Sequence, residues 1–143
     1  MTWYQLITPP KSVDSVFAGS PPALSALKLH ETRARPTDAG EQVDLLLEWP
    51  VLPAGAPPKW RAKGHTALQL LLTLHATTRV EKNGVFCGRP VSIEMSPGLL
   101  TIKQDDGEAS MTFTLARVSA QFNPYGGDTL HEGIHFQAFR DDA

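Results

Sequence analysis

The alternation of leucines between Gly64 and Thr77, GHTALQLLLTLHAT, constrains the fold of this chain more than any other stretch. Leucine occupies every second position from 68 to 74. A period of two puts these four leucines on one face of a β-strand and a mostly polar set on the other. A helix would leave Leu70 and Leu74 well off the face that other apolar residues share. The alternation therefore predicts a long central strand, which strand-forming residues extend to Val80.

Shorter alternations recur along the chain and are separated by turn signals such as Lys82-Asn-Gly84 and Asp105-Asp-Gly107. Residues 12–19 read as a short N-terminal helix, and 35–40 read as a loop. The further strands are expected at 24–32, 43–49, 90–95, 99–103, 111–115 and 118–122, and around Ile134, Phe136 and Ala138. We therefore expect a mainly β fold, with α+β as the alternative: an antiparallel sheet or sandwich of about eight strands in a single domain, 1–143.

Residues 50–58 contain four prolines and one glycine. Proline lacks the amide donor that a helix interior or an inner strand requires, so this stretch is expected to be a stiff surface connector. Trp49 and Trp60 stand at its two ends. We expect both rings to be structural anchors in the core, although indole rings at such positions can also stack on ligands.

Charge and cysteine content narrow the classes of partner and site. The formal net charge of −2 gives no field that calls for nucleic acid or an anionic membrane. Cys87 is the sole cysteine of the chain, so an internal disulfide and a cysteine-built metal site are excluded. The first ten residues lack a basic stretch followed by an apolar run, and the leucine run is too short to span a bilayer. These features favour a cytoplasmic location.

One literal motif match suggests zinc chemistry: His131-Glu132-Gly133-Ile134-His135 reads H-E-x-x-H. A zinc peptidase needs these histidines one helical turn apart, with the glutamate activating the metal-bound water. Glycines precede and interrupt this match, and the alternation that follows is typical of a strand. On a strand the two histidines would lie about 13 Å apart, too far for one zinc ion with bonds of about 2 Å. We therefore expect a polar strand face and no bound metal, with a zinc hydrolase as the alternative.

The remaining reactive side chains form no recognisable catalytic arrangement in the sequence. His30, His65 and His75 fall on different segments, and Cys87 has no adjacent activating pair, so it reads as a structural thiol. No nucleophile elbow, phosphate-binding loop or dinucleotide fingerprint occurs. The sequence therefore predicts no catalytic residues and no cofactor.

Acidic residues gather at one predicted hairpin tip, and an aromatic residue stands near an acid at a later turn. The tip carries Asp105, Asp106 and Glu108, and the turn carries Tyr125 and Asp128. Such groups can contact a basic partner, although a solvated hairpin tip is the simpler interpretation. We take these five residues as candidates for partner binding.

Several segments, in order and spacing, resemble the immunity protein 50 family of bacterial polymorphic-toxin systems. The resemblance covers residues 3–80 and thins after Gly84. It rests on Trp3-Tyr4, Phe17-Ala-Gly19, Pro22-Ala-Leu24 leading into Leu27 and Leu29, the strand from Val43 to Leu47, Pro57-Pro-Lys-Trp60, and Gly64 with the alternating leucines.

The resemblance implies a small cytoplasmic protein without catalytic activity that binds and neutralises a cognate toxin domain, usually encoded by a neighbouring gene. It names neither the toxin nor the contact residues. Two alternatives from other classes remain: the zinc hydrolase, and a scaffold or ligand-binding β domain with another partner. Neighbouring genes and metal content are the observations that separate these three readings.

The spacing of His131 and His135 on a strand predicts that the purified protein holds no stoichiometric zinc. Elemental analysis of protein prepared without a histidine tag measures this. One zinc per chain that disappears in a His135→Ala variant would overturn the strand assignment and favour the hydrolase.

Overall fold

The computed structural model describes residues 3–8, 13, 16–17 and 21–125. None of the helices among these residues is long and apolar enough to cross a membrane. The elements, in chain order, are a 3-10 helix η1 (Trp3–Leu6), β1 (Lys28–Thr37), β2 (Gly40–Trp49), α2 (Pro58–Ala62), β3 (Ala67–Asn83), β4 (Val91–Ser96), β5 (Leu99–Gln104), β6 (Ser110–Thr114) and β7 (Arg117–Tyr125).

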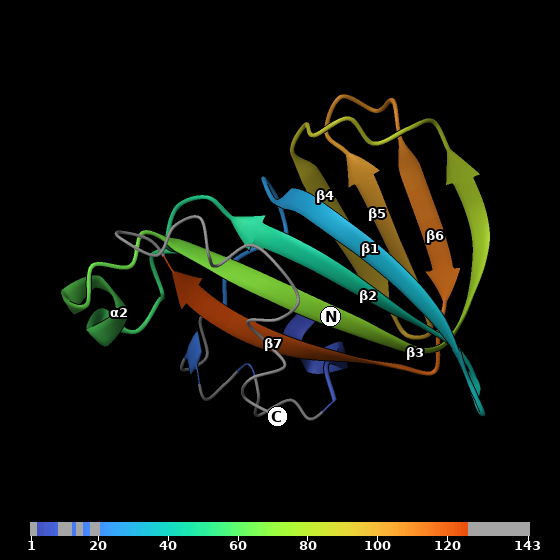
Figure 1. Ribbon diagram of the computed structural model, residues 1–143, viewed down its shortest axis with the longest axis horizontal. Helices are drawn as coiled ribbons and strands as arrows, with labels where there is room; N and C mark the ends of the chain where they lie inside the picture. Colours follow the sequence, from blue (N-terminus) through green and yellow to red (C-terminus); the bar gives the residue numbers. More distant parts are fainter. Residues whose placement is uncertain (1–2, 9–12, 14–15, 18–20, 126–143) are drawn as a thin grey trace.

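The seven strands of the described residues form one antiparallel sheet in the order β1-β2-β3-β6-β5-β4, with β7 paired to β3. Figure 1 shows the sheet folded, so that β4, β5 and β6 lie across from β1 and β2. The prediction of a mainly β, antiparallel fold is confirmed. Of the predicted strands, the last one, around Ile134, lies outside the described residues, as do most positions of the predicted helix at 12–19.

The sheet has two halves, one with β1, β2 and β7 and one with β4, β5 and β6. The long strand β3 joins them because it changes partner midway. From Ala67 to His75 it pairs with β7, and from Thr78 to Asn83 it pairs with β6. Between these stretches Ala76 has a φ of +54°, and the pairing with β2 shifts by one residue. An extra residue in the left-handed conformation is a β-bulge of the type that normally carries glycine, and bulges bend a strand. The bulge at Ala76 marks the point at which the sheet bends.

The predicted alternation of β3 is confirmed in its core half. The four leucines at 68, 70, 72 and 74 are fully buried and belong to one hydrophobic cluster. The cluster combines residues from both halves of the sheet, including Leu45 and Leu47 of β2, Ile93 of β4, Leu100 and Ile102 of β5, and Phe113 of β6. Burial of each such side chain contributes about 1.5–3 kcal/mol, so this shared core holds the folded sheet together.

Two segments differ from their predicted form. β1 continues to Thr37 although 35–40 reads as a loop, because only Asp38 and Ala39 separate β1 from β2. The connector prediction of 50–58 is wrong at its end, where Pro58 starts the helix α2. Proline suits the first turn of a helix because its missing N–H would have no partner there.

Both connector tryptophans are buried and close an aromatic cluster. Trp49 is 6% exposed and stacks on Phe122, with ring centroids 6.5 Å apart. Trp60 is 9% exposed and meets Phe17 edge-on at 6.5 Å, while Phe17 also contacts Phe122 at 5.2 Å. The Trp49 indole N–H donates to the carbonyl of Ala23 at 3.2 Å. The cluster thus ties the connector to β2 and β7.

Truncation of Trp60 should be severely destabilising because it leaves a cavity beside Phe17. We expect Trp60→Ala to lower the free energy of unfolding by about 3–5 kcal/mol. Urea melts measure this, with Val51→Ala as the control, since Val51 is 74% exposed in the same connector. A loss below about 0.5 kcal/mol, the range of surface substitutions, would contradict the anchoring role.

Candidate functional site

The predicted acidic tip lies at the β5–β6 turn, where its carboxylates are held by neighbouring groups of the same chain. Asp106 accepts hydrogen bonds from Nε2 of the buried Gln104 at 3.0 and 3.1 Å and lies 3.3 Å from Nε of Arg89. Asp105 accepts one from the Ser92 hydroxyl at 2.7 Å. The bond from Gln104, followed by that from the Glu108 N–H, lowers the pKa of Asp106. These contacts give the tip a structural role in the turn.

The structure does not bring this tip together with the second predicted group. Tyr125 ends β7 opposite Ala67, at the start of β3, whereas β6 begins opposite Asn83, at the end of β3. Figure 1 shows these two ends far apart. Tyr125 is also buried, 3% exposed, and Asp128 lies outside the described residues. Of the predicted residues that the structure describes, Tyr125 therefore does not share a surface with the acidic tip.

His30, His65 and His75 lie on different segments, and the zinc-like motif at 131–135 lies outside the described residues. His30 contacts Glu48 at 3.1 Å, and His65 precedes β3. Across the described residues no group of three or more side chains is arranged to hold a metal ion. Cys87 is exposed, and its backbone N–H donates to the Gln104 side chain at 3.0 Å.

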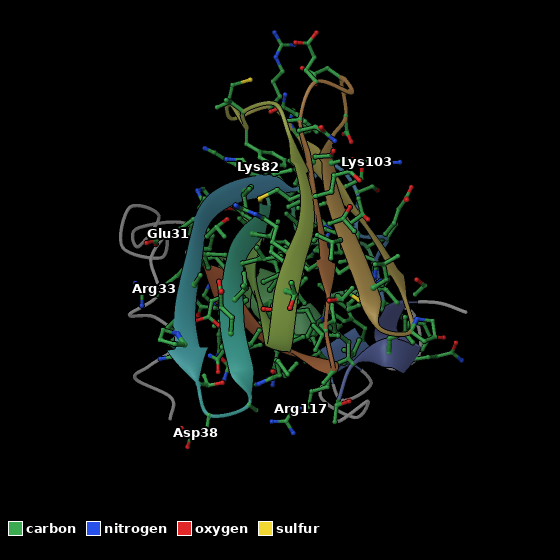
Figure 2. All side chains as sticks on the ribbon, turned by 90° about the vertical axis from the view of Figure 1, so that its right-hand side faces the viewer. Glu31, Arg33, Asp38, Lys82, Lys103 and Arg117 are labelled. Atoms are coloured by element: carbon green, nitrogen blue, oxygen red, sulfur yellow. The ribbon has the colours of Figure 1, made fainter. Side chains whose placement is uncertain are left out.

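The described surface offers a different candidate, the distal half of the β1–β2 hairpin, residues 31–41. From Glu31 to Glu41 only Arg33 is half-buried; all the others are exposed. Figure 1 shows the tip of this hairpin extending past the rest of the sheet, and Figure 2 shows Glu31, Arg33 and Asp38 along its outer side. We call residues 31–41 the projecting hairpin.

A hollow of about 580 Å³ opens where the hairpin tip meets the bulge of β3. Gly40 lies beside Ala76 at this junction, and its φ of +124° favours glycine. Asp38 and Arg117 point outward at this end of the molecule in Figure 2. The residues that line this outer hollow are Thr37, Asp38, Ala39, Gln42, His75, Ala76, Ala116 and Arg117.

His75 is the titratable group at the base of the outer hollow. Its Nε2 lies 3.2 Å from the Ser119 hydroxyl. Partial burial lowers the pKa of His75 below its ordinary 6.5, the positive charge of Arg117 lowers it further, and Asp44 opposes the shift. The imidazole is therefore neutral at pH 7 and serves as a polar contact rather than a cation.

A second hollow, of about 380 Å³, opens on the inner side of the hairpin between the two halves of the sheet. Its floor is apolar, with Val43, Met111 and Phe113, and its rim carries Glu41 and Arg79. Thr32, Ala34, Thr77 and Thr78 complete the lining. The projecting hairpin thus separates two hollows, each lined by both polar and apolar residues, and a partner that spans the hairpin would contact both.

Sequence reasoning missed this surface because it assigned 35–40 to a loop and 24–32 to a shorter strand. The signal that could have found it is the alternation of charged residues at 31, 33 and 35 with small or apolar ones at 32, 34 and 36. That alternation is typical of a strand with one solvated face.

Comparison with protein-family models, with curated proteins and with solved structures finds no match to this chain.

The environment of His75 makes stability depend on pH. Because its pKa is lowered on folding, the unfolded chain binds more protons between the folded value and 6.5. The contribution of His75 to the free energy of unfolding is therefore fully present above pH 6.5 and is lost as the pH falls through this window. NMR titration of the imidazole should show a pKa below 6.5 in the folded chain.

Two variants test the contributions of the neighbouring charges to the pKa shift of His75. Arg117→Gln should raise the His75 pKa by removing a positive charge, and Asp44→Asn should lower it further. Arg79→Gln, which lies at the inner hollow, is the control and should leave the titration unchanged. A His75 pKa at or above 6.5 would contradict this geometry, and so would a His75 pKa that neither substitution changes.

Proposed function

We propose that this chain is an immunity protein that binds and neutralises a cognate toxin domain, without catalysis, and that the projecting hairpin with its two flanking hollows is the binding surface. The observation that carries the proposal is this exposed hairpin, which stands between two hollows that open on its two faces. The identity of the partner class comes from the resemblance to the immunity protein 50 family.

The range covered by the resemblance includes the candidate surface, although the segments that carry it flank residues 31–41. That range runs from residue 3 to 80 and so includes β1, β2 and β3 through the bulge at Ala76. The acidic tip at 105–108 falls in the part where the resemblance has thinned.

The shape of the surface favours a protein partner over a small molecule. A small ligand occupies one concave site, whereas these hollows open on the two faces of one ribbon. A standard protein interface buries about 1,600 Å² in total, enough to span the ribbon and both hollows. The ribbon also mixes Glu31, Arg35 and Asp38, and such charges set association rate and partner choice more than affinity.

Co-expression with the toxin domain encoded by a neighbouring gene tests the function. The chain should protect the host cell, and a complex of the two proteins should survive gel filtration. If the toxin kills equally with and without this chain and no complex forms, the immunity proposal is wrong.

Matched charge reversals test the surface. Arg35→Glu combined with Asp38→Lys keeps the net charge and should weaken toxin binding at least about tenfold, since arginines in interfaces are frequent hot spots. Arg89→Glu combined with Glu108→Lys, at and beside the acidic tip, also keeps the net charge; it is the comparison and should leave binding unchanged. Loss of binding by the tip variant alone would move the interface to the tip. Unfolding melts check that both variants fold.

A further inference from the structure

The distal part of β1 has one edge without a partner strand in the described part of the chain. Thr37 and Gly40 close the two-residue turn of the hairpin. In an antiparallel pair the main-chain N–H and C=O groups of alternate residues bond to the partner strand, so those of Arg33 and Arg35 point toward β2. The intervening residues Thr32, Ala34 and Pro36 turn their main-chain groups to the outer edge.

Three independent observations support this assignment. Glu41, opposite Pro36, turns its carbonyl toward β3, where the Thr77 hydroxyl donates to it at 2.9 Å. The register of the β1–β2 pair shifts between Leu29 and Glu31. Leu27, on the same edge before this shift, exchanges backbone hydrogen bonds of 3.0 and 2.8 Å with Val91 of β4. Pro36 lies at a position where its missing N–H removes no bond to β2.

The edge is accessible and has hydrogen-bonding capacity. The bridge to Val91 occupies it at Leu27, and it is open from Thr32 onward within the described residues. Thr32, Ala34 and Pro36 are all exposed. Two N–H donors and three carbonyl acceptors are therefore available to an added strand, which is how extended peptides bind sheet edges.

The side chains beside this edge specify what such a strand would carry. On the inner side Thr32 and Ala34 line the apolar-floored hollow above Met111 and Phe113. On the outer side Arg33, whose Nη2 lies 3.8 Å from Oε1 of Glu31, and Arg35 project from the opposite face of β1. A strand that pairs here places alternate side chains on the two faces, so apolar ones reach the hollow and acidic ones meet the arginines.

We propose that the outer edge of β1, from Thr32 to Pro36, accepts an extended segment of the partner protein as an added strand, with apolar side chains on its inner face and acidic ones on its outer face. This deepens the proposed function and rests on it only for the identity of the partner.

Pairing of two copies of β1 is disfavoured by the same side chains. A two-fold antiparallel pair would place the arginines of one strand beside those of the other on a shared face. Like charges across a strand pair are destabilising, and each copy would also bring a proline that cannot donate. A second copy of β1 is therefore disfavoured as the occupant of this edge.

The decisive variant is Ala34→Pro, which removes an outward N–H and leaves the bonds between β1 and β2 in place, as Pro36 already does. Ala34→Ser is the matched control. Random peptides displayed on phage, selected on the immobilised wild-type chain and then synthesised, are the probe. We expect selected peptides that alternate apolar and acidic residues, with binding about tenfold weaker or worse for Ala34→Pro and unchanged for Ala34→Ser.

A second readout does not depend on the fold of the variant. In the wild-type chain the amides of Thr32 and Ala34 should exchange rapidly with solvent and become protected when a selected peptide binds. The amides of Arg33 and Arg35 should be protected throughout. No enrichment of peptides, equal binding by Ala34→Pro, or protection elsewhere would overturn the proposal.

Protection assays against the toxin distinguish the strand-addition proposal from the immunity proposal. If the wild-type chain gives no protection, the immunity proposal fails while the peptide measurements still decide the edge. If the wild-type chain and a folded Ala34→Pro variant protect equally well, strand addition fails and the immunity function stands.

Discussion

The change of partner along β3 is the constraint on which the rest of the structure depends. One strand of 17 residues pairs with β7 in its first part and with β6 in its last, and β2 lies along its other edge. Ala76 adds one residue between these parts in a left-handed conformation. Without that extra residue the ladder would continue straight, and the leucines of β3 would have no second half of sheet to cover them.

The same bend creates the candidate surface. Because the sheet folds at Ala76, the half that contains β4, β5 and β6 covers only the proximal part of β1 and β2, and the pairing of Leu27 with Val91 closes that corner. The distal hairpin is left exposed, with Gly40 seated on Ala76. The two hollows lie on either side of this junction. The surface is therefore a consequence of the fold rather than a separate motif.

Much of the fold could be predicted from the sequence because each strand carries its own signal. The leucines of β3 and the turn at Asp105-Asp-Gly107 are local patterns, and the structure has them as predicted. The bend could not be predicted, because a bulge with a left-handed φ normally carries glycine, whereas position 76 is alanine with a φ of +54°. The helix α2 was not predicted, because the prolines of residues 50–58 indicated a surface connector, although proline also occurs at the first position of helices.

The candidate site was less predictable than the fold. Clustered acids at 105–108 are conspicuous in the sequence, but Gln104, Arg89 and Ser92 already hold the carboxylates of Asp105 and Asp106 in the structure. The hairpin carries mixed charges and no motif, so only its placement relative to β3 and β6 marks it. Contacts between residues distant in sequence define this surface, and no local pattern encodes them.

The measurement that tests the bend most directly is the stability of an Ala76→Gly variant in urea. A left-handed φ costs alanine about 1–2 kcal/mol that glycine does not pay, whereas glycine elsewhere in a strand is destabilising. We predict that Ala76→Gly is at least as stable as the wild-type chain, while Ala67→Gly, in the same strand without the bulge, is less stable. A loss of about 1 kcal/mol or more in Ala76→Gly would contradict a bulge at this position, and with it the exposure of the hairpin.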